Sequence, residues 1–270
     1  MLGLVSLLTD VSSEMIAPLR AVFLVLVLGT PLPVAGLIEG VAESVSSLLK
    51  VGSGRLADRL SRRKPLLVAG YALSNAAKPL LALAGNWPDV LGIVLADRTG
   101  KGLRTSPRDA LLADATPAPF RGKAFGFHRA MDTLGAALGP LLALLLISQS
   151  PEEDQQSLQV LRQVFAWTVV PGVLSVLAVL MLLRERPRQP ASADLPAALA
   201  ASASRGQRLA ALGAPFWLFT GLATLFALGN SSDAFLFLRT LSLESWLEGV
   251  PLVFSPATSC TPRWPHPWAC

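Results

Sequence analysis

The chain has 270 residues, of which 52% are hydrophobic and only 15% are charged. In soluble globular domains about a quarter of the residues are charged, so this composition excludes that class and indicates a membrane protein. The net charge is +5, yet the basic residues fall in short segments without interleaved aromatic residues, so we expect no nucleic acid partner. The two cysteines, Cys260 and Cys270, suit neither a disulfide framework nor a metal site. We expect no cofactor and no metal ion.

Apolar segments long enough to cross a bilayer follow one another along the chain, and β-barrel alternation is absent, which predicts an all-α membrane protein. The first segment lacks a basic amino-terminal region and a cleavage site, so we expect it to be a retained helix. We expect helices over residues 2–28, 34–54, 65–84, 90–116, 122–147 and 160–183, and the start of a seventh near residue 209.

These helices suggest four parts: a six-helix amino-terminal transmembrane bundle (1–183), a polar cytoplasmic linker (184–208), the start of a second bundle with helix 7 (209–240), and an aberrant or disordered tail (241–270). The tail holds five prolines and no apolar run long enough to span. Two interpretations stay open: a disordered terminus, or a frameshift or truncation that replaced helix 8 onward. A short repeat favours the second, because Ser12-Ser13-Glu14 with Arg20 recurs as Ser231-Ser232-Asp233 with Arg239.

Lysine and arginine are concentrated in every second loop. The loops after helices 2, 4 and 6 hold twelve of them, whereas the loops after helices 1, 3 and 5 hold none. Because positive loops stay inside, we expect a multi-pass protein of the cell membrane with a cytoplasmic amino terminus.

The densest basic segment is Gly52–Lys64, which reads GSGRLADRLSRRK. We expect it to be a turn at the cytoplasmic membrane face, since so many charges cannot lie in hydrocarbon. Residues 54–59 and 62–64 resemble the signature between helices 2 and 3 of the major facilitator superfamily of secondary transporters, with Ser61 where a glycine is usual. The resemblance implies a conformational latch made by Gly54, Asp58, Arg59, Arg62 and Arg63. The alternative is a turn that only anchors the chain.

The fourth expected helix carries an unusual number of charges. Arg98 and Gly102 resemble an R-x-x-x-G element of the same superfamily, which implies a part in proton coupling. Asp97, Lys101, Arg104 and Arg108 recur at helical spacing and predict one stripe facing a protein or water-filled cavity, with Asp109 beside it. Asp97 and Lys101 are spaced to pair across one turn, which leaves Arg98, Arg104 and Arg108 unneutralised apart from Asp109. The alternative is that this half of the helix lies in water on the cytoplasmic side and is held by salt bridges.

The fifth expected helix contains Gly126, Gly135, Gly139 and Pro140 at the spacing of a helix-5 motif of drug/proton antiporters in the superfamily. The final glycine pair of that motif is missing, because Ala143-Leu144 stands there. The resemblance implies an antiporter, whereas close helix packing alone also explains these residues.

A proton carrier must be a carboxylate whose proton affinity changes with exposure and nearby charge. The candidates are Asp10 and Glu14 on helix 1, Glu39 and Glu43 on helix 2, and Asp132 on helix 5 near Arg129. We favour Asp10 and Glu14, because Ser12 and Ser13 add polar lining beside them. Each candidate can instead belong to a structural ion pair, as we expect for Lys78 and His128.

The resemblance as a whole covers residues 1–240 and implies a secondary transporter of the superfamily, one that couples efflux of a small molecule to protons by alternating access. Its expected partners are the lipid bilayer, protons and an unknown small-molecule substrate. One full bundle is half of that machine, so we expect the chain alone not to transport. The alternative is a half-transporter that self-associates or pairs with a missing second bundle. An enzyme is not expected, because only His128 and His266 are available for a catalytic cluster.

Overall fold

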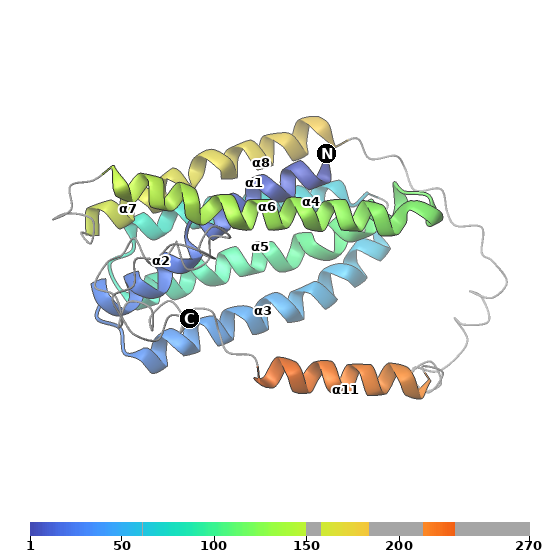
Figure 1. The fold of residues 1–270 in the computed structure, drawn as a ribbon, viewed down its shortest axis with the longest axis horizontal. Coiled ribbons are helices and arrows are strands. Elements are labelled where there is room, and N and C mark those ends of the chain that lie inside the picture. The colour runs from blue at the N-terminus through green and yellow to red at the C-terminus, as the bar shows by residue number, and fades with distance from the viewer. Residues whose placement is uncertain (61, 150–157, 184–212, 230–270) are drawn as a thin grey trace, which may run out of the picture. The chain divides into compact units, whose positions relative to one another are not determined.

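The computed structural model describes residues 1–60, 62–149, 158–183 and 213–229 (Figure 1). These residues are almost entirely helical and contain no strand, which agrees with the predicted all-α membrane fold. The expected linker (184–208), the tail (241–270) and the second copy of the repeat lie outside the described residues. The chain divides into two units, one that contains residues 1–185 and one of residues 186–233, and each is described by itself.

The first span is divided into three pieces, so the prediction of one unbroken helix over residues 2–28 is wrong. It consists of α1 (Leu2–Glu14), α2 (Ala17–Val22) and a π-helical turn, η1 (Phe23–Val27). Pro18 explains the first break, because it has no N–H to donate to the carbonyl of Glu14 and its ring collides with that carbonyl. The chain therefore changes direction directly after Glu14.

The second span, α3 (Leu32–Arg59), follows Gly29, whose φ of 61° makes the reversal possible. It continues five residues beyond the expected end, so Gly52–Lys64 is not one turn: its first eight residues are helical and α4 begins at Lys64. Packing explains the difference. Ser53 Oγ donates to the carbonyl of Gly102 at 2.8 Å and Ala57 is buried, so the end of α3 is held against α5.

The remaining spans lie close to their expected positions, and prolines again explain the breaks. The described elements are α4 (Lys64–Ala77), η2 (Lys78–Leu83), α5 (Trp87–Asp114), η3 (Ala118–Phe120), α6 (Arg121–Ser148), α7 (Leu158–Trp167) and α8 (Val169–Leu182). The tighter turn η2 contains Pro79, and Pro171 follows the break at Thr168. Helix α5 begins three residues earlier than expected, because Asn86 Oδ1 caps it by accepting from the N–H of Asp89 at 3.0 Å.

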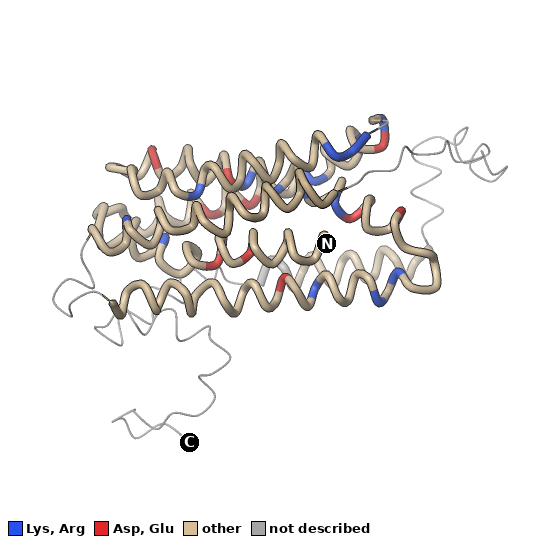
Figure 2. Tube along the Cα trace, turned by 90° about the horizontal axis from the view of Figure 1, so that it is seen from above, with Lys and Arg blue, Asp and Glu red and all other residues tan. Residues whose placement is uncertain are grey.

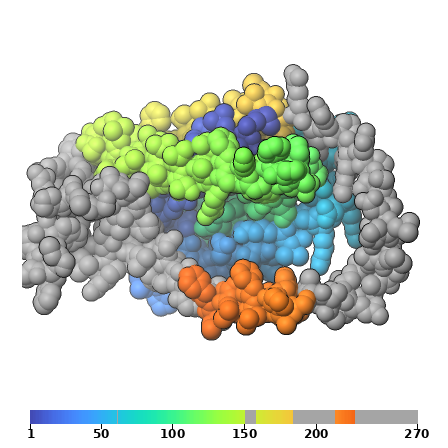
Figure 3. All heavy atoms as spheres, turned by 45° about the vertical axis from the view of Figure 1, so that its right-hand side comes forward, coloured from blue at the N-terminus to red at the C-terminus, as the bar shows by residue number. Residues whose placement is uncertain are grey.

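Helix α5 lies against both α3 and α4, and α1 packs between α6 and α8 (Figures 1 and 3). Helix α4 also contacts α8, and η2 contacts α7. Apolar side chains fill the spaces between them, for example Phe23 and Phe165, whose rings meet edge to face at 5.3 Å. The described spans of the first unit thus form one bundle.

Four helical stretches of the described residues are long and apolar enough to cross a membrane: Leu32–Arg59, Lys64–Leu83, Ala118–Ser148 and Leu158–Leu182. The broken first span and the highly charged α5 are not among them. Helix α11 (Ala214–Gly229), the described part of the second unit, is a shorter apolar helix where helix 7 was expected. Its Thr220 and Thr224 hydroxyls donate to carbonyls one turn earlier, which satisfies them within the helix.

Glycines let α5 approach its two neighbours closely. A Cβ built on Gly100 would lie 2.6 Å from the carbonyl oxygen of Gly70 and from the N–H nitrogen of Ser74, so α4 and α5 touch through their backbones. On the other side, a Cβ on Gly102 would lie 2.6 Å from Leu49 Cβ. Small residues at such positions are a common basis for helix association in membranes.

We predict that Gly100→Ala destabilises the bundle by about 1 to 3 kcal/mol, because the added methyl group must push backbone apart. Gly92→Ala, on the same helix with open space around it, is the matched control and should gain up to about 1 kcal/mol from better helix propensity. Thermal unfolding in detergent, followed by circular dichroism, measures both. Equal unfolding temperatures for the two variants would contradict the close contact.

Candidate functional site

A small, partly open cavity lies between the first span, η2 and α5. Figure 2 shows acidic and basic positions along the middle of the bundle as well as toward its ends. Seven charged side chains line the cavity: Glu14, Arg20, Lys78, Asp97, Arg98, Lys101 and Arg104. The predicted stripe therefore does reach a cavity, through its first three members.

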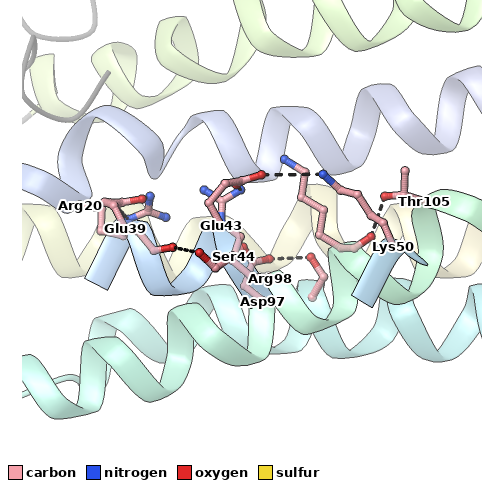
Figure 4. A network of polar contacts seen from close by, with 11 residues as sticks. Arg20, Glu39, Glu43, Ser44, Lys50, Asp97, Arg98 and Thr105 are labelled. Atoms are coloured by element: carbon pink, nitrogen blue, oxygen red, sulfur yellow. Dashed lines mark hydrogen bonds and ion pairs between the residues drawn. The ribbon is translucent and has the colours of Figure 1, made fainter. Parts of the chain in front are cut away.

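Two of the cations in the wall are held by carboxylates of α3 (Figure 4). Arg20 Nη2 lies 2.6 Å from Glu39 Oε1, and both side chains are largely buried. Arg98 Nη1 lies 3.6 Å from Glu43 Oε2, and Lys50 Nζ lies 3.8 Å from the other oxygen of Glu43. The expectation that Arg98 is unneutralised is therefore wrong, because α3 supplies a partner that spacing along α5 could not reveal.

The other buried groups are bound mainly by neutral partners. Ser74 Oγ donates to Asp97 Oδ1 at 2.6 Å and accepts from Arg104 Nη1 at 3.3 Å. The Arg104 guanidinium also lies over the ring of Tyr71, at 4.6 Å from its centre. Lys78 Nζ donates to Asn75 Oδ1 at 3.0 Å and to the carbonyl of Thr9 at 3.3 Å. The expectation of a structural role for Lys78 stays a prediction, because Lys78 also lines the cavity.

The expected pair between Asp97 and Lys101 does not form. Within the described residues, the Lys101 side chain has no ion pair and no hydrogen bond, and the same holds for the carboxylate of Glu14. Both side chains line the cavity and are only partly buried. They are thus the two charged wall residues whose side chains have neither a hydrogen bond nor an ion pair in the described part of the chain.

The remaining candidates lie outside the cavity lining. Arg108 Nε donates to Asp109 Oδ1 at 3.0 Å and Arg108 Nη1 to Ser6 Oγ at 3.2 Å. Asp132 Oδ2 lies 3.4 Å from His128 Nδ1, whereas Arg129, the neighbour expected from the sequence, is exposed. Asp10 is partly buried on α1.

The glycines of the fifth span do not have one common role. A Cβ on Gly135 would lie 2.9 Å from Asp10 Cβ, and a Cβ on Gly139 would lie 2.7 Å from Glu14 Cβ, so α6 touches α1 beside both favoured carboxylates. Gly126 has nothing within 4 Å of such a Cβ. Close packing at two of the three glycines therefore also positions the candidate proton carriers.

The basic motif has Arg63 at its centre. Its side chain is buried, Nη1 lies 2.6 Å from Asp114 Oδ2 at the end of α5, and Nη2 lies 3.5 Å from Asp58 Oδ1. Gly54 faces Ser106 of α5 in ordinary contact, whereas Arg59 and Arg62 are exposed. The motif thus ties α3 and α4 to the end of α5.

Sequence reasoning missed Arg20 and Lys78 as wall residues and Asp114 as the partner of Arg63. An isolated cation within a long apolar run was the available signal for the first two. Asp114 carries no such signal, since it stands among the residues of a helix end. The described residues contain no group of His, Cys, Asp and Glu able to hold a metal ion.

The model of the Major Facilitator Superfamily matches residues 2–260. An uncharacterised MFS-type transporter of Methanocaldococcus jannaschii is 42% identical over 147 residues, which are 54% of this chain and 36% of that protein. An uncharacterised protein of Mycobacterium tuberculosis is 32% identical over 256 residues, 94% of this chain and 60% of that protein. The chain thus spans less than two thirds of these relatives.

A solved structure has the same fold. It is an inward-facing, occupied bacterial homologue of the human lysosomal transporter Spinster, with a TM-score of 0.61 and 18% identity over 71% of this chain and 44% of that chain. At this identity the likeness concerns the fold alone. The superfamily match passes residue 241, so it includes part of the segment expected to be an aberrant tail.

We predict that Gly139→Ala lowers the free energy of unfolding by about 1 to 3 kcal/mol, because a methyl group at this position meets Glu14 and the backbone of α1. Gly126→Ala, in the same motif and helix, should leave it unchanged or slightly higher. Thermal unfolding in detergent measures both changes. Similar losses in both variants would show that the glycines act through helix propensity and not through contact.

For the basic motif, we predict that Asp114→Asn lowers the free energy of unfolding by about 1 kcal/mol, the range of partly exposed ion pairs. Asp58→Asn should cost less, because Asp58 lies farther from Arg63 and is 72% exposed, against 58% for Asp114. Urea titration of the two variants in the same detergent gives the comparison. A larger loss for Asp58→Asn would contradict the central role of Asp114.

Proposed function

Because the chain belongs to the Major Facilitator Superfamily, a family of membrane transporters and not of enzymes, we propose that it acts in proton-coupled efflux of a small molecule by alternating access. The single observation that carries the proposal is the cavity lined by seven charged side chains inside a bundle of membrane-spanning helices. Each charge at the centre of a membrane helix costs about 2.5 to 3.5 kcal/mol, so such clusters mark solute and ion pathways.

Glu14 is the proposed proton carrier of this cavity. It lines the wall, its carboxylate makes no hydrogen bond or ion pair within the described residues, and it stands at the break between α1 and α2. A carboxylate must meet these conditions to exchange protons, since a firmly paired group would keep its charge. Asp10, one turn earlier on α1 and also against a glycine of α6, is the second candidate.

The other candidates have partners that favour a structural role. Glu39 is bound to Arg20 and Glu43 to Arg98, so both carboxylates hold cations of the wall in place. Asp97 accepts from Ser74, and Asp132 lies beside His128. We assign to Arg98 the positioning of charge near Glu14, as its resemblance to the R-x-x-x-G element implies.

We further propose that the protein lies in the cell membrane with its amino terminus in the cytoplasm. The support is the alternation of basic and uncharged loops, together with a basic motif that joins α3 and α4 at the end of α5. The direction of transport rests on the helix-5 motif, which is similar to that of drug/proton antiporters.

A second candidate function is a half-transporter that acts as a membrane assembly partner. The observation that favours it is that the described spans of the first unit pack as one bundle, and transporters of this kind combine two such bundles. Such a chain would self-associate or bind a separately encoded second bundle. Crosslinking in native membranes distinguishes the two, because a discrete dimer supports assembly between chains.

To test coupling, we predict that everted membrane vesicles in which the chain is produced together with a second bundle lose part of an imposed proton gradient when a transported compound is added, whereas vesicles with the chain alone do not. Acridine orange fluorescence reports this loss across a panel of anionic, neutral and cationic compounds. Glu14→Gln should abolish the response, because an amide cannot carry a proton. Asp10→Asn should reduce or abolish it.

Asp89→Asn is the matched control for these variants. It also replaces one carboxylate by an amide, but at the start of α5, where the new amide oxygen can still accept from the N–H of Gly85. This variant should respond as the native chain does. An unchanged response in Glu14→Gln and Asp10→Asn would remove both from the coupling. No response to any compound, even with the second bundle present, would contradict the proposed transport.

A further inference from the structure

We propose that the cavity binds a small solute through a carboxylate or phosphate group, held by Lys101 and Arg104. This inference rests on the proposed transport function and extends it by naming the chemical class of the substrate. Of the seven charged side chains that line the wall, five are cationic and two are anionic.

The ion pairs leave three cations of the wall without a carboxylate partner. Glu39 and Glu43 neutralise Arg20 and Arg98 from outside the lining. The cations Lys78, Lys101 and Arg104 remain, and none of them has a carboxylate within ion-pair distance among the described residues. The wall carboxylates near them are those of Glu14 and Asp97, and the carboxylate of Asp10 on α1 also acts on Lys101 and Arg104.

The two anionic groups are poor sites for a cationic solute. Asp97 Oδ1 already accepts a hydrogen bond from the Ser74 hydroxyl at 2.6 Å. The same Ser74 oxygen accepts a hydrogen bond from the guanidinium of Arg104. Glu14 is the one wall carboxylate without a side-chain hydrogen bond in the described part of the chain, and in the proposed cycle it carries the proton. A cation in this cavity would meet three like charges, whereas an anion would neutralise them.

Lys101 and Arg104 have suitable geometry for an oxyanion. They lie three residues apart on α5 and both line the cavity, so they face the same space. Arg104 is 5% exposed, and its contact with Tyr71 holds the guanidinium in place. Its hydrogen bond to Ser74 uses one N–H, and the others have no acceptor among the described residues. A fixed guanidinium beside a lysine suits a carboxylate or phosphate, since arginine can bind two oxygens at once.

A second wall arginine also has a free donor. Arg98 Nε is buried and has no hydrogen-bond partner in the described structure. Such buried donors are rare unless a ligand or water completes them. The cavity is small and partly open, so we expect it to take up the charged oxygen group of a solute while the rest of the solute lies at its mouth.

The test is direct binding to the purified full chain in detergent at constant ionic strength. The probes are succinate, inorganic phosphate, neutral succinamide and cationic 1,4-diaminobutane, measured by isothermal titration calorimetry. We expect succinate, phosphate or both to bind, and the two other probes not to bind. Succinate against phosphate distinguishes a carboxylate site from a phosphate site.

Variants assign the binding to the proposed residues. Lys101→Gln should weaken anion binding about tenfold or more, the effect of losing one charge-assisted hydrogen bond, and Lys101→Arg should restore most of it. Arg104→Lys keeps the charge and should weaken binding because the two-oxygen contact is lost. Lys123→Gln removes an exposed cation on α6, remote from the cavity lining, and should bind as the native chain does. Each variant is used only if it elutes as the native chain on size-exclusion chromatography.

Three results would overturn the proposal: no binding of either anion, binding of diaminobutane or succinamide in their place, or unchanged anion binding in Lys101→Gln and Arg104→Lys. These failures are distinct from failure of the proposed function. If anions bind but no compound dissipates the proton gradient, the proposed coupling is wrong and the proposed anion site stands. If only cationic compounds dissipate the proton gradient, the proposed anion site is wrong and the proposed proton coupling stands.

Discussion

Helix α5 can lie within a membrane bundle only because α3 and α4 approach it closely enough to cover its charges. The approach depends on Gly100 and Gly102, where an added Cβ would collide with neighbouring chain at 2.6 Å. At this separation Arg104 reaches both Tyr71 and Ser74 on α4. Close backbone packing and burial of charge are therefore one constraint, since a wider gap would leave α5 with charges in lipid and no partners.

The positions of the spans could be predicted because they depend on local properties. Long apolar runs fix where a helix can cross the membrane, and helical periodicity placed Asp97, Lys101 and Arg104 on one face before any contact was known. The breaks were harder to predict. Pro18 stands within an apolar run that continues to Leu28, and the length of such a run does not show a break inside it. The end of α3 depends on a hydrogen bond from Ser53 to α5.

The partners of the charges could not be read from one helix at a time. Spacing along α5 suggested that Asp97 pairs with Lys101, whereas Asp97 binds Ser74 of α4 and Arg98 lies near Glu43 of α3. These contacts join residues far apart in sequence, so they follow from packing and not from periodicity. For the same reason Asp114 was missed, although its oxygen lies 2.6 Å from Arg63. The motif indicated which residues gather at this turn but not which helix end they contact.

Steric and electrostatic constraints meet at Glu14. It ends α1, because Pro18 cannot donate to its carbonyl, and its Cβ faces Gly139 of α6 at a distance that leaves no space for a methyl group. Its carboxylate reaches the cavity that Lys101 and Arg104 also line. A movement that α6 transmits to α1 through the close contact at Gly139 shifts this carboxylate relative to the cations of α5. In this bundle a change in helix position is also a change in the electrostatic field around Glu14, which is the physical requirement for a carboxylate that takes up a proton in one conformation and releases it in another.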